Sequence, residues 1–423
     1  MSVESGNIQS DSHYDTVLRA AYPGVVASLT RILGDMDLAM DATQEAMLKA
    51  LQAWPASGLP DSPTAWLVST GRNSAYDHFR KTGKLVSLDT HPDYETDNAI
   101  WEAPSLSELQ DDVLRLMFTC CHPNLSPSVQ ITLVLKVVLG FSTDEIARAL
   151  LVSVASIEKR LSRARNTLSA DGPEYAIPRG EEIPERLQAV LQAVYLLFNE
   201  GYTRLQSGDE AQADAQRLVD EATRLARMLC RLLRRHPDPR SLLALMLLAA
   251  ARLPARRSVL GELIPLLEQD RTLWDCALSR EGVALVDAVF VARHPPSAYQ
   301  IQAAISVLHN QAASAEATDW AQIAGLYKQL ANYDPSPVIA VNEAVALCMN
   351  GQCEQARRML AASAKDPALV SYQPYYAALA FVSEKLGHQQ AAMDNLKQAI
   401  ALSQSAAQRS WLQSKLDDLA TTV

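Results

Sequence analysis

The sequence predicts an all-α protein built from several domains. Its 423 residues are enough for two to four domains, and 48% of them are hydrophobic, which argues against a largely disordered chain. Leu, Ala and Gln dominate long stretches and only 16 residues are Gly, so the composition favours helices over sheets. Apolar side chains recur every three to four residues along most of the chain, as they do on one face of a helix.

Net charge and cysteine content limit the classes of function that this protein can have. The formal net charge of −10 excludes a generally basic coat, so any contact with DNA must be local. None of the six cysteines forms a CxxC pair or accompanies a His cluster, so we expect reduced thiols and no metal site. Gly-rich phosphate loops and recognisable catalytic spacings are missing from the sequence, and we expect neither a cofactor nor enzymatic activity.

Hydropathy predicts a cytoplasmic protein without a membrane partner. The longest apolar run, residues 242–251, is too short to span a bilayer. The first 22 residues are polar and acidic, unlike a secretory signal peptide.

The first part of the chain predicts three helices. Helical spacing covers residues 15–54, with Leu48 and Leu51 among its apolar positions, and is interrupted at Gly34-Asp35. Residues 55–63 are rich in turn formers and predict a loop, and a further helix follows over 64–81.

Residues 72–84 combine positive charge with aromatic side chains. Four Lys or Arg side chains stand against one Asp, with Tyr76, His78 and Phe79 between them. Unpaired bases stack on aromatic rings, and their phosphates contact cations. This segment could therefore hold a single strand of DNA.

An acidic linker is predicted over residues 85–112. It contains eight Asp or Glu residues and no Lys or Arg. Such a tether is expected to stay extended and to avoid DNA.

The sharpest local motif is a helix-turn-helix at residues 142–161. Ser142 or Thr143 can cap a first helix over 143–150, and a second helix is expected over 154–169. Residues 153–167 hold four Lys or Arg against one Glu, which suits phosphates and guanine edges in a major groove. Leu151 stands where such turns usually have Gly. Taken alone, the motif is also compatible with a helical hairpin that has a solvated basic face.

The remaining chain predicts pairs of helices joined by short turns. The turns at Gly351 and Gly387 have similar surroundings and lie 36 residues apart, close to a tetratricopeptide period. Two ordinary helical hairpins would give the same pattern. The segment 199–202 (NEGY) is either a ligand or interdomain site or a helix end capped by Gly201.

The order of these pieces resembles the extracytoplasmic-function (ECF) sigma factors. Residues 34–46 resemble their polymerase-binding helix, residues 63–81 their promoter-melting helix, and residues 140–165 their helix-turn-helix that reads the −35 element. The segments 114–123 and 195–202 resemble a subgroup with a long tetratricopeptide-like C-terminal domain. With that subgroup included, the resemblance covers nearly the whole chain.

The resemblance implies an all-α domain organisation. The parts are a sigma-two-like helical domain that binds polymerase and the −10 element (10–84), an acidic linker (85–112), a sigma-four-like helix-turn-helix domain (113–170), a second linker (171–183) and a helical tetratricopeptide-like regulatory domain (184–423).

The resemblance also implies a function: an alternative sigma factor that directs core RNA polymerase to specific promoters and initiates transcription. The implied partners are promoter DNA and the clamp helices and flap of core RNA polymerase, while a protein or peptide ligand of the C-terminal domain stays open. The implied site residues are Asp41, Gln44 and Glu45 for polymerase; Leu59, Asp61, Arg72, Asn73, Tyr76, Arg80 and Lys81 for the −10 element and melting; and Glu158, Lys159, Ser162 and Arg163 for the −35 element.

Two other functions are compatible with parts of the sequence. A helix-turn-helix regulator acting without core polymerase would use only the motif at 142–161. A helical-repeat scaffold would use only the C-terminal half. Capture of core polymerase separates both from a sigma factor.

Overall fold

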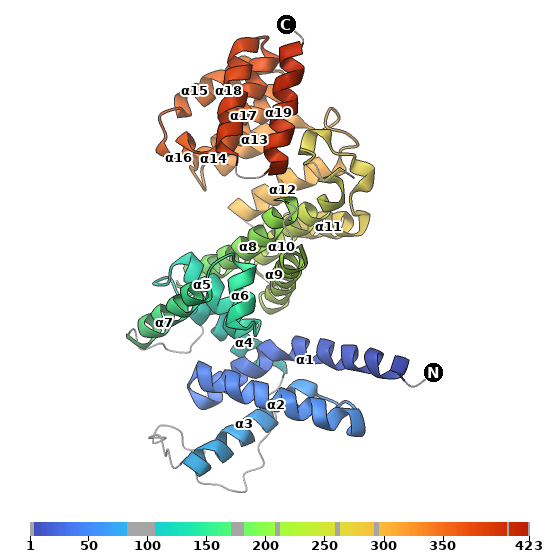
Figure 1. Cartoon of the computed structure of the whole chain (residues 1–423), viewed down its shortest axis with the longest axis vertical. Helices are drawn as coiled ribbons and strands as arrows, with labels where there is room; N and C mark the ends of the chain where they lie inside the picture. The colour runs from blue at the N-terminus through green and yellow to red at the C-terminus, as the bar shows by residue number, and fades with distance from the viewer. Residues whose placement is uncertain are drawn as a thin grey trace. The chain divides into compact units, whose positions relative to one another are not determined.

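The computed structural model describes residues 4–82, 106–170, 182–207, 212–258, 263–291, 296–403 and 406–421. Within these ranges every regular element is a helix, apart from one bridge between Arg257 and Leu263, which confirms the predicted all-α fold class. The helices form two compact units, residues 1–196 and residues 197–423. Figure 1 labels most of the elements of both units.

Three helices that pack on one another open the first unit: α1 (Glu4–Leu33), α2 (Met36–Ser57) and α3 (Pro63–Thr82). The predicted break at Gly34-Asp35 is confirmed. Gly34 has φ +71°, and the Asp35 carboxylate caps α2 by accepting the N–H of Leu38 at 3.0 Å. Helix α1 begins well before the predicted start at residue 15. The core between the helices includes Val25, Val26, Leu29, Ala42, Ala46, Trp54, Leu67 and Val68.

Four further helices belong to the first unit: α4 (Leu106–Cys120), α5 (Pro127–Leu133), α6 (Thr143–Ala149) and α7 (Val154–Ala170). Helix α5 continues into a π-helical turn, η2 (Val134–Val138). Helix α1 contacts both α4 and η2, so the later helices meet the opening three mainly through α1.

Helix α4 begins at Leu106, inside the segment that the sequence predicts as a linker. Asp112 is 2% exposed, and its carboxylate accepts the Ser28 hydroxyl at 2.8 Å and the Arg31 Nε–H at 3.0 Å. The prediction of an extended tether is therefore wrong for residues 106–112, because an ion pair with α1 makes this acid part of a packed contact. The rest of the predicted linker, 85–105, lies outside the described residues.

The second unit begins within α8 (Glu182–Ser207) and is helical over most of its described length. The prediction of uninterrupted helix pairs is wrong over residues 251–258 and 263–275, which are irregular and contain short 3₁₀ turns. These turns are η3 (Leu253–Ala255), η4 (Leu266–Glu268) and η5 (Arg271–Leu273). The other helices are α9 (Gln212–Leu232), α10 (Pro237–Ala250), α11 (Cys276–Val291), α12 (Ala298–Gln311), α13 (Trp320–Leu330), α14 (Pro337–Met349), α15 (Cys353–Ser363), α16 (Pro367–Val370), α17 (Gln373–Lys385), α18 (Gln389–Leu402) and α19 (Ala406–Thr421).

Two helical hairpins occupy the positions of the sequence repeat. Helices α14 and α15 form the first, and α17 and α18 form the second. Gly351 and Gly387 lie in the corresponding turns, with φ +79° and +76°, a conformation that favours glycine.

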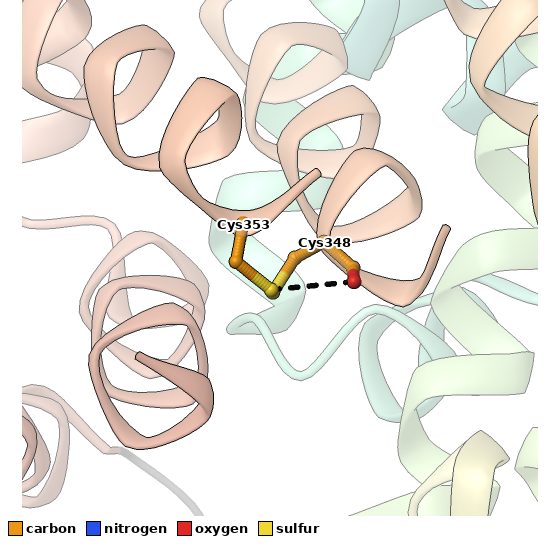
Figure 2. The surroundings of a disulfide bond; sticks show 2 residues. All are labelled: Cys348 and Cys353. Carbon is orange, nitrogen blue, oxygen red and sulfur yellow. Dashed lines mark hydrogen bonds between the residues drawn. A yellow bond between two sulfur atoms is a disulfide. The ribbon is translucent and has the colours of Figure 1, made fainter. Parts of the chain in front are cut away.

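A disulfide joins Cys348 and Cys353 across the turn of the first hairpin (Figure 2). The prediction that all six cysteines are reduced thiols is therefore wrong for this pair, because the turn brings the end of α14 and the start of α15 together. The other four cysteines are free. Burial raises the pKa of Cys120 to about 12 and that of Cys230 to about 11, so these thiols are poor nucleophiles.

Gly201 lies inside α8, not at its end, so the interpretation as a helix cap is wrong. A Cβ on this residue would lie 2.5 Å from the carbonyl oxygen of Ala215 and 2.8 Å from Cβ of Leu218, both on α9. Glycine is required here because the two helix backbones approach each other closely.

Substituting Gly201 and Gly325 by alanine should change stability in opposite directions. Gly201→Ala pushes against the α9 backbone and should lower the free energy of unfolding by about 2–3 kcal/mol. Gly325→Ala, inside α13 with no atom within 4 Å of the added carbon, should raise it by about 0.5–1 kcal/mol. Urea unfolding of the two variants measures both values, and shifts of the same sign would contradict the packing argument.

Candidate nucleic-acid and partner interface

Helix α2 exposes the three side chains predicted to bind polymerase. Asp41, Gln44 and Glu45 are all exposed, and Ala42 and Ala46 are buried on the opposite side of the helix. Spacings of three and four residues place the exposed side chains on one face. Glu45 also forms an exposed ion pair with Lys49 at 3.2 Å, whereas no ion pair of Asp41 is seen among the described residues.

Two leucines extend this face and were not predicted as functional residues. Leu48 is 61% exposed and Leu51 is 47% exposed, although their spacing predicts apolar positions of a core-forming helix. The core side of α2 is instead an alanine stripe that ends at Trp54, because small side chains allow α2 to pack closely. The sequence signal that could have identified these two leucines as exposed is their spacing, which is out of phase with the alanine stripe. We call Asp41, Gln44, Glu45, Leu48 and Leu51 the α2 face.

Helix α3 carries most of the residues predicted for the −10 element and melting. Asn73 and Arg80 are exposed, and Arg72 lies over the ring of Tyr76 with its Cζ 5.0 Å from the ring centre. Both members of this cation–π pair are half-buried. Their spacing puts these four side chains on one side of α3. The side chain of Lys81 lies outside the described residues.

The loop before α3 exposes Leu59 and Asp61. Trp66 is half-buried, and its ring meets the buried ring of Trp54 edge-on at 5.6 Å. Phe79 is half-buried.

Helices α6 and α7 form the predicted helix-turn-helix. Ser142 caps α6 in a capping box: its hydroxyl accepts the Glu145 N–H at 3.2 Å, and the Glu145 carboxylate accepts the Ser142 N–H at 2.8 Å. Leu151, in the turn, has φ +51°, the left-handed conformation for which glycine is usual. Ile146 and Ile157 are buried between the two helices.

Helix α7 exposes all four residues predicted to read the −35 element. Glu158, Lys159, Ser162 and Arg163 are exposed, whereas Ala164 is buried on the other side of the helix. The helix presents one continuous polar face of the length and shape that enters a major groove.

One contact links the end of α7 to the start of α2. Arg165 forms an ion pair with Asp37 at 2.9 Å, and both side chains are more than half exposed. A cavity of about 750 Å³ lies beside it, and its lining includes Met40 and Leu161. The first turn of α2 therefore contacts α7, and the α2 face follows further along the same helix.

Known families match the two halves of this first unit separately. The family described as Sigma-70 region 2 matches residues 17–85, which include α2 and α3, and the family Sigma-70, region 4 matches residues 115–168, which include the helix-turn-helix. The ECF RNA polymerase sigma factor EcfG of Rhodopseudomonas palustris (strain TIE-1) is 31% identical over 176 residues, or 90% of that protein and 39% of this chain. The chain belongs to the sigma-70 family.

The part of this sigma-70 family chain beyond region 4 has relatives without a known role. A family of unknown function, DUF6596, matches residues 186–290. An uncharacterised protein of Rhizobium meliloti (strain 1021) is 37% identical over 412 residues, 96% of each chain. No solved structure matches this chain.

The described residues contain no helix that is long and apolar enough to cross a membrane. They also contain no group of three or more His, Cys, Asp or Glu side chains placed to hold a metal ion.

Proposed function

We propose that this protein is an alternative sigma factor of the ECF type that binds core RNA polymerase in the cytoplasm and directs it to specific promoters. The observation that carries the proposal is the pairing of regions 2 and 4 in one chain, with most of the predicted contact residues of each region exposed. The chain contributes binding and orientation, and the polymerase synthesises the RNA.

The α2 face is the proposed docking surface for the polymerase clamp helices. Its carboxylates at Asp41 and Glu45 suit basic side chains, and Leu48 and Leu51 offer apolar area beside them. Large exposed apolar side chains grouped together mark interaction sites on soluble proteins. Region 4 is the proposed contact for the flap.

The exposed side of α3 is the proposed surface for the opened −10 element. Arg72 and Arg80 can contact phosphates, while Tyr76 provides a ring for an unpaired base. The loop with Leu59 and Asp61 directly precedes α3 in the sequence. We propose that this loop holds a base that is turned out of the duplex.

The two rival functions are disfavoured by the α2 face. A helix-turn-helix regulator that acts without polymerase has no use for two exposed leucines beside exposed acids on a different helix. A scaffold that acts through its C-terminal half has no use for them either.

Capture of core polymerase followed by run-off transcription tests the proposal. Tagged full-length protein should retain purified core polymerase, and the complex should start transcripts at fixed positions on genomic fragments. Retention without promoter-specific initiation, or tight duplex binding without polymerase, would overturn it.

Arg163→Ala should weaken recognition of the −35 element by about 1–3 kcal/mol, or roughly 5- to 150-fold in affinity. Arg163 is exposed on the groove-facing side of α7, where its guanidinium can contact a guanine edge. Holoenzyme binding to a cognate promoter measures the effect. Arg280→Ala, the same loss of charge at an exposed position in the second unit, is the control. Equal binding by the two variants would remove Arg163 from base recognition.

We further propose that residues 184–423 form a tetratricopeptide-like domain that modulates initiation. EcfG matches only 39% of this chain, so most of the remainder needs a role other than promoter recognition. Stacked helical hairpins provide binding surfaces for a protein or peptide, and a short tether keeps the local concentration high, on the order of mM. We favour a positive role, because even a weak contact could then hold the two DNA-binding regions in a set arrangement.

Removing the C-terminal half should change promoter output strongly. Versions ending at Ala170 and at Ser207 bracket α8, whose first part belongs to the first unit and whose remainder belongs to the second. Run-off transcription compares each with the full chain after circular dichroism has established that it is folded. Unchanged output from a folded truncated protein would exclude a role in initiation.

A further inference from the structure

The second unit contains a cluster of arginines and aromatic rings, most of which lie outside its α-helices. Arg252 and Arg256 follow α10, Arg271 belongs to η5, and Tyr202 lies on α8. Two guanidinium groups lie over the ring of Trp274, with Arg252 Cζ 5.4 Å and Arg271 Cζ 5.1 Å from the ring centre.

The second side of the cluster pairs Arg256 with Tyr202. The Arg256 Cζ lies 5.1 Å from the ring centre of Tyr202, and its Nη1 donates a hydrogen bond to the tyrosine hydroxyl. These two residues, together with Arg252 and Arg271, are partly exposed when each residue is taken as a whole, whereas the Nε atoms of Arg252 and Arg256 are buried.

Within the described part of the chain, the arginines of this cluster carry positive charge without a carboxylate in ion-pair contact. Among the described residues, none of the ion pairs that the structure shows involves Arg252, Arg256 or Arg271. The nearby acid is the exposed Glu316, which interacts with Arg271. Burial, with Arg256 and Arg271 nearby, lowers the pKa of Arg252 to about 10. The site is strongly positive although the protein has a net charge of −10.

Several buried polar atoms in the cluster have no hydrogen-bond partner. They are Nε of Arg252, Nε of Arg256, Nε1 of Trp274 and Nδ1 of His309. Trp274 is 5% exposed and His309 is 6% exposed. The pKa of His309 is lowered to about 3 by burial and by Arg252 and Arg271. Water could satisfy the hydrogen bonds, but it cannot neutralise three guanidinium charges in a partly desolvated place.

Arg271 has a supporting part in this arrangement. Its Nη1 donates to the carbonyl oxygens of His309 and Ala312 at 2.7 and 2.9 Å, and its Nη2 donates to the Thr318 hydroxyl at 3.1 Å. These bonds hold its guanidinium against Trp274. Arg252 Nη2 donates to the Ser306 carbonyl oxygen at 3.3 Å, so the unpartnered guanidinium donors of the cluster are the Nε atoms of Arg252 and Arg256.

We propose that Arg252 and Arg256, supported by Arg271, Trp274 and Tyr202, form a binding site for the phosphate group of a small molecule. Arginine presents planar paired donors that match phosphate oxygens, and a dianion balances more of the cluster than a single carboxylate does. All five residues lie in the stretch matched by the family of unknown function. The site needs neither polymerase nor DNA, so it does not depend on the proposed sigma activity.

Calorimetric titration of the full-length protein at constant ionic strength tests the site. Orthophosphate and glycerol 3-phosphate are the probes, and citrate and a short DNA duplex are the comparators. We expect saturable binding of at least one phosphate probe. Tighter binding of orthophosphate indicates a free ion as the ligand, and tighter binding of glycerol 3-phosphate indicates a phosphate ester. Arg256→Gln should weaken that binding by about tenfold or more, as expected for the loss of a charged hydrogen-bond donor.

Two matched variants keep the test decisive. Arg280→Gln removes an exposed arginine of the same unit and should leave binding unchanged. Arg252→Lys keeps the charge but loses the paired donors, and should weaken binding in a protein that circular dichroism shows to be folded. The absence of saturable phosphate binding, equal affinity in Arg256→Gln, or binding of citrate or DNA in place of phosphate would each overturn the proposal.

Discussion

Replacing Asp41 and Glu45 together by lysine is expected to weaken binding of the protein to core RNA polymerase by about a hundredfold to a thousandfold. Both carboxylates are exposed on one side of α2 and stand beside Leu48 and Leu51. Like charges brought face to face in a contact cost several kcal/mol, and each 1.4 kcal/mol corresponds to a factor of about ten in affinity. The apolar area contributed by the leucines would remain, but the reversed charges would prevent close approach to a basic partner.

Titration of labelled core polymerase with each variant measures this effect. The control is Asp417→Lys with Asp418→Lys, the same change of charge on exposed positions of α19. Leu48→Ala with Leu51→Ala should also weaken binding without changing the charge, because it removes apolar contact area. Full affinity in the Asp41/Glu45 variant would show that polymerase docks elsewhere on the protein.

Asp112→Ala is expected to lower the free energy of unfolding of the first unit by about 2–4 kcal/mol. The carboxylate is 2% exposed and is bonded to both Ser28 and Arg31, so its removal leaves a buried hydroxyl and a cation without their acceptor. The loss should be smaller than for a fully buried pair, because the Arg31 side chain is 40% exposed and can bind water instead.

The neighbouring residue provides a matched control. Asp111 is exposed on the same helix, and Asp111→Ala should change stability by no more than about 0.5 kcal/mol. Urea unfolding measures the total, and amide hydrogen exchange in α4 shows whether the loss is local. Equal effects of the two substitutions would mean that the contact between α1 and α4 does not depend on Asp112.

Local sequence features predicted the elements where turn chemistry is unambiguous. Gly34 and Asp35 predicted the break between α1 and α2, and both have the expected roles, a left-handed turn and a helix cap. Ser142 was one of two candidates for the cap of α6, and the structure selects it. Gly351 and Gly387 marked two equivalent turns. Each of these predictions depends on interactions within a few residues.

Predictions that needed long-range contacts were less successful. Asp112 looked like part of a solvated acidic tether, but Arg31, 81 positions earlier, makes it part of a packed contact. Gly201 looked like a helix end, but a neighbouring helix backbone requires it inside α8. Cys348 and Cys353 looked like independent thiols, and a hairpin turn joins them.

The sequence by itself determined the helical fold class, because periodicity and helix caps depend on neighbouring residues. Its resemblance to the ECF sigma factors implied the order of regions 2 and 4. The tertiary structure alone decided which apolar side chains stay outside the core. Leu48 and Leu51 have helical spacing like that of buried leucines, and the close approach of α2 to its neighbours, through alanines, leaves them exposed. The structure alone also gathered Tyr202, Arg252, Arg256 and Arg271 into one cluster, since no local pattern relates residues separated by up to 69 positions. Burial and charge balance depend on the whole packed unit, and therefore only the packed unit reveals them.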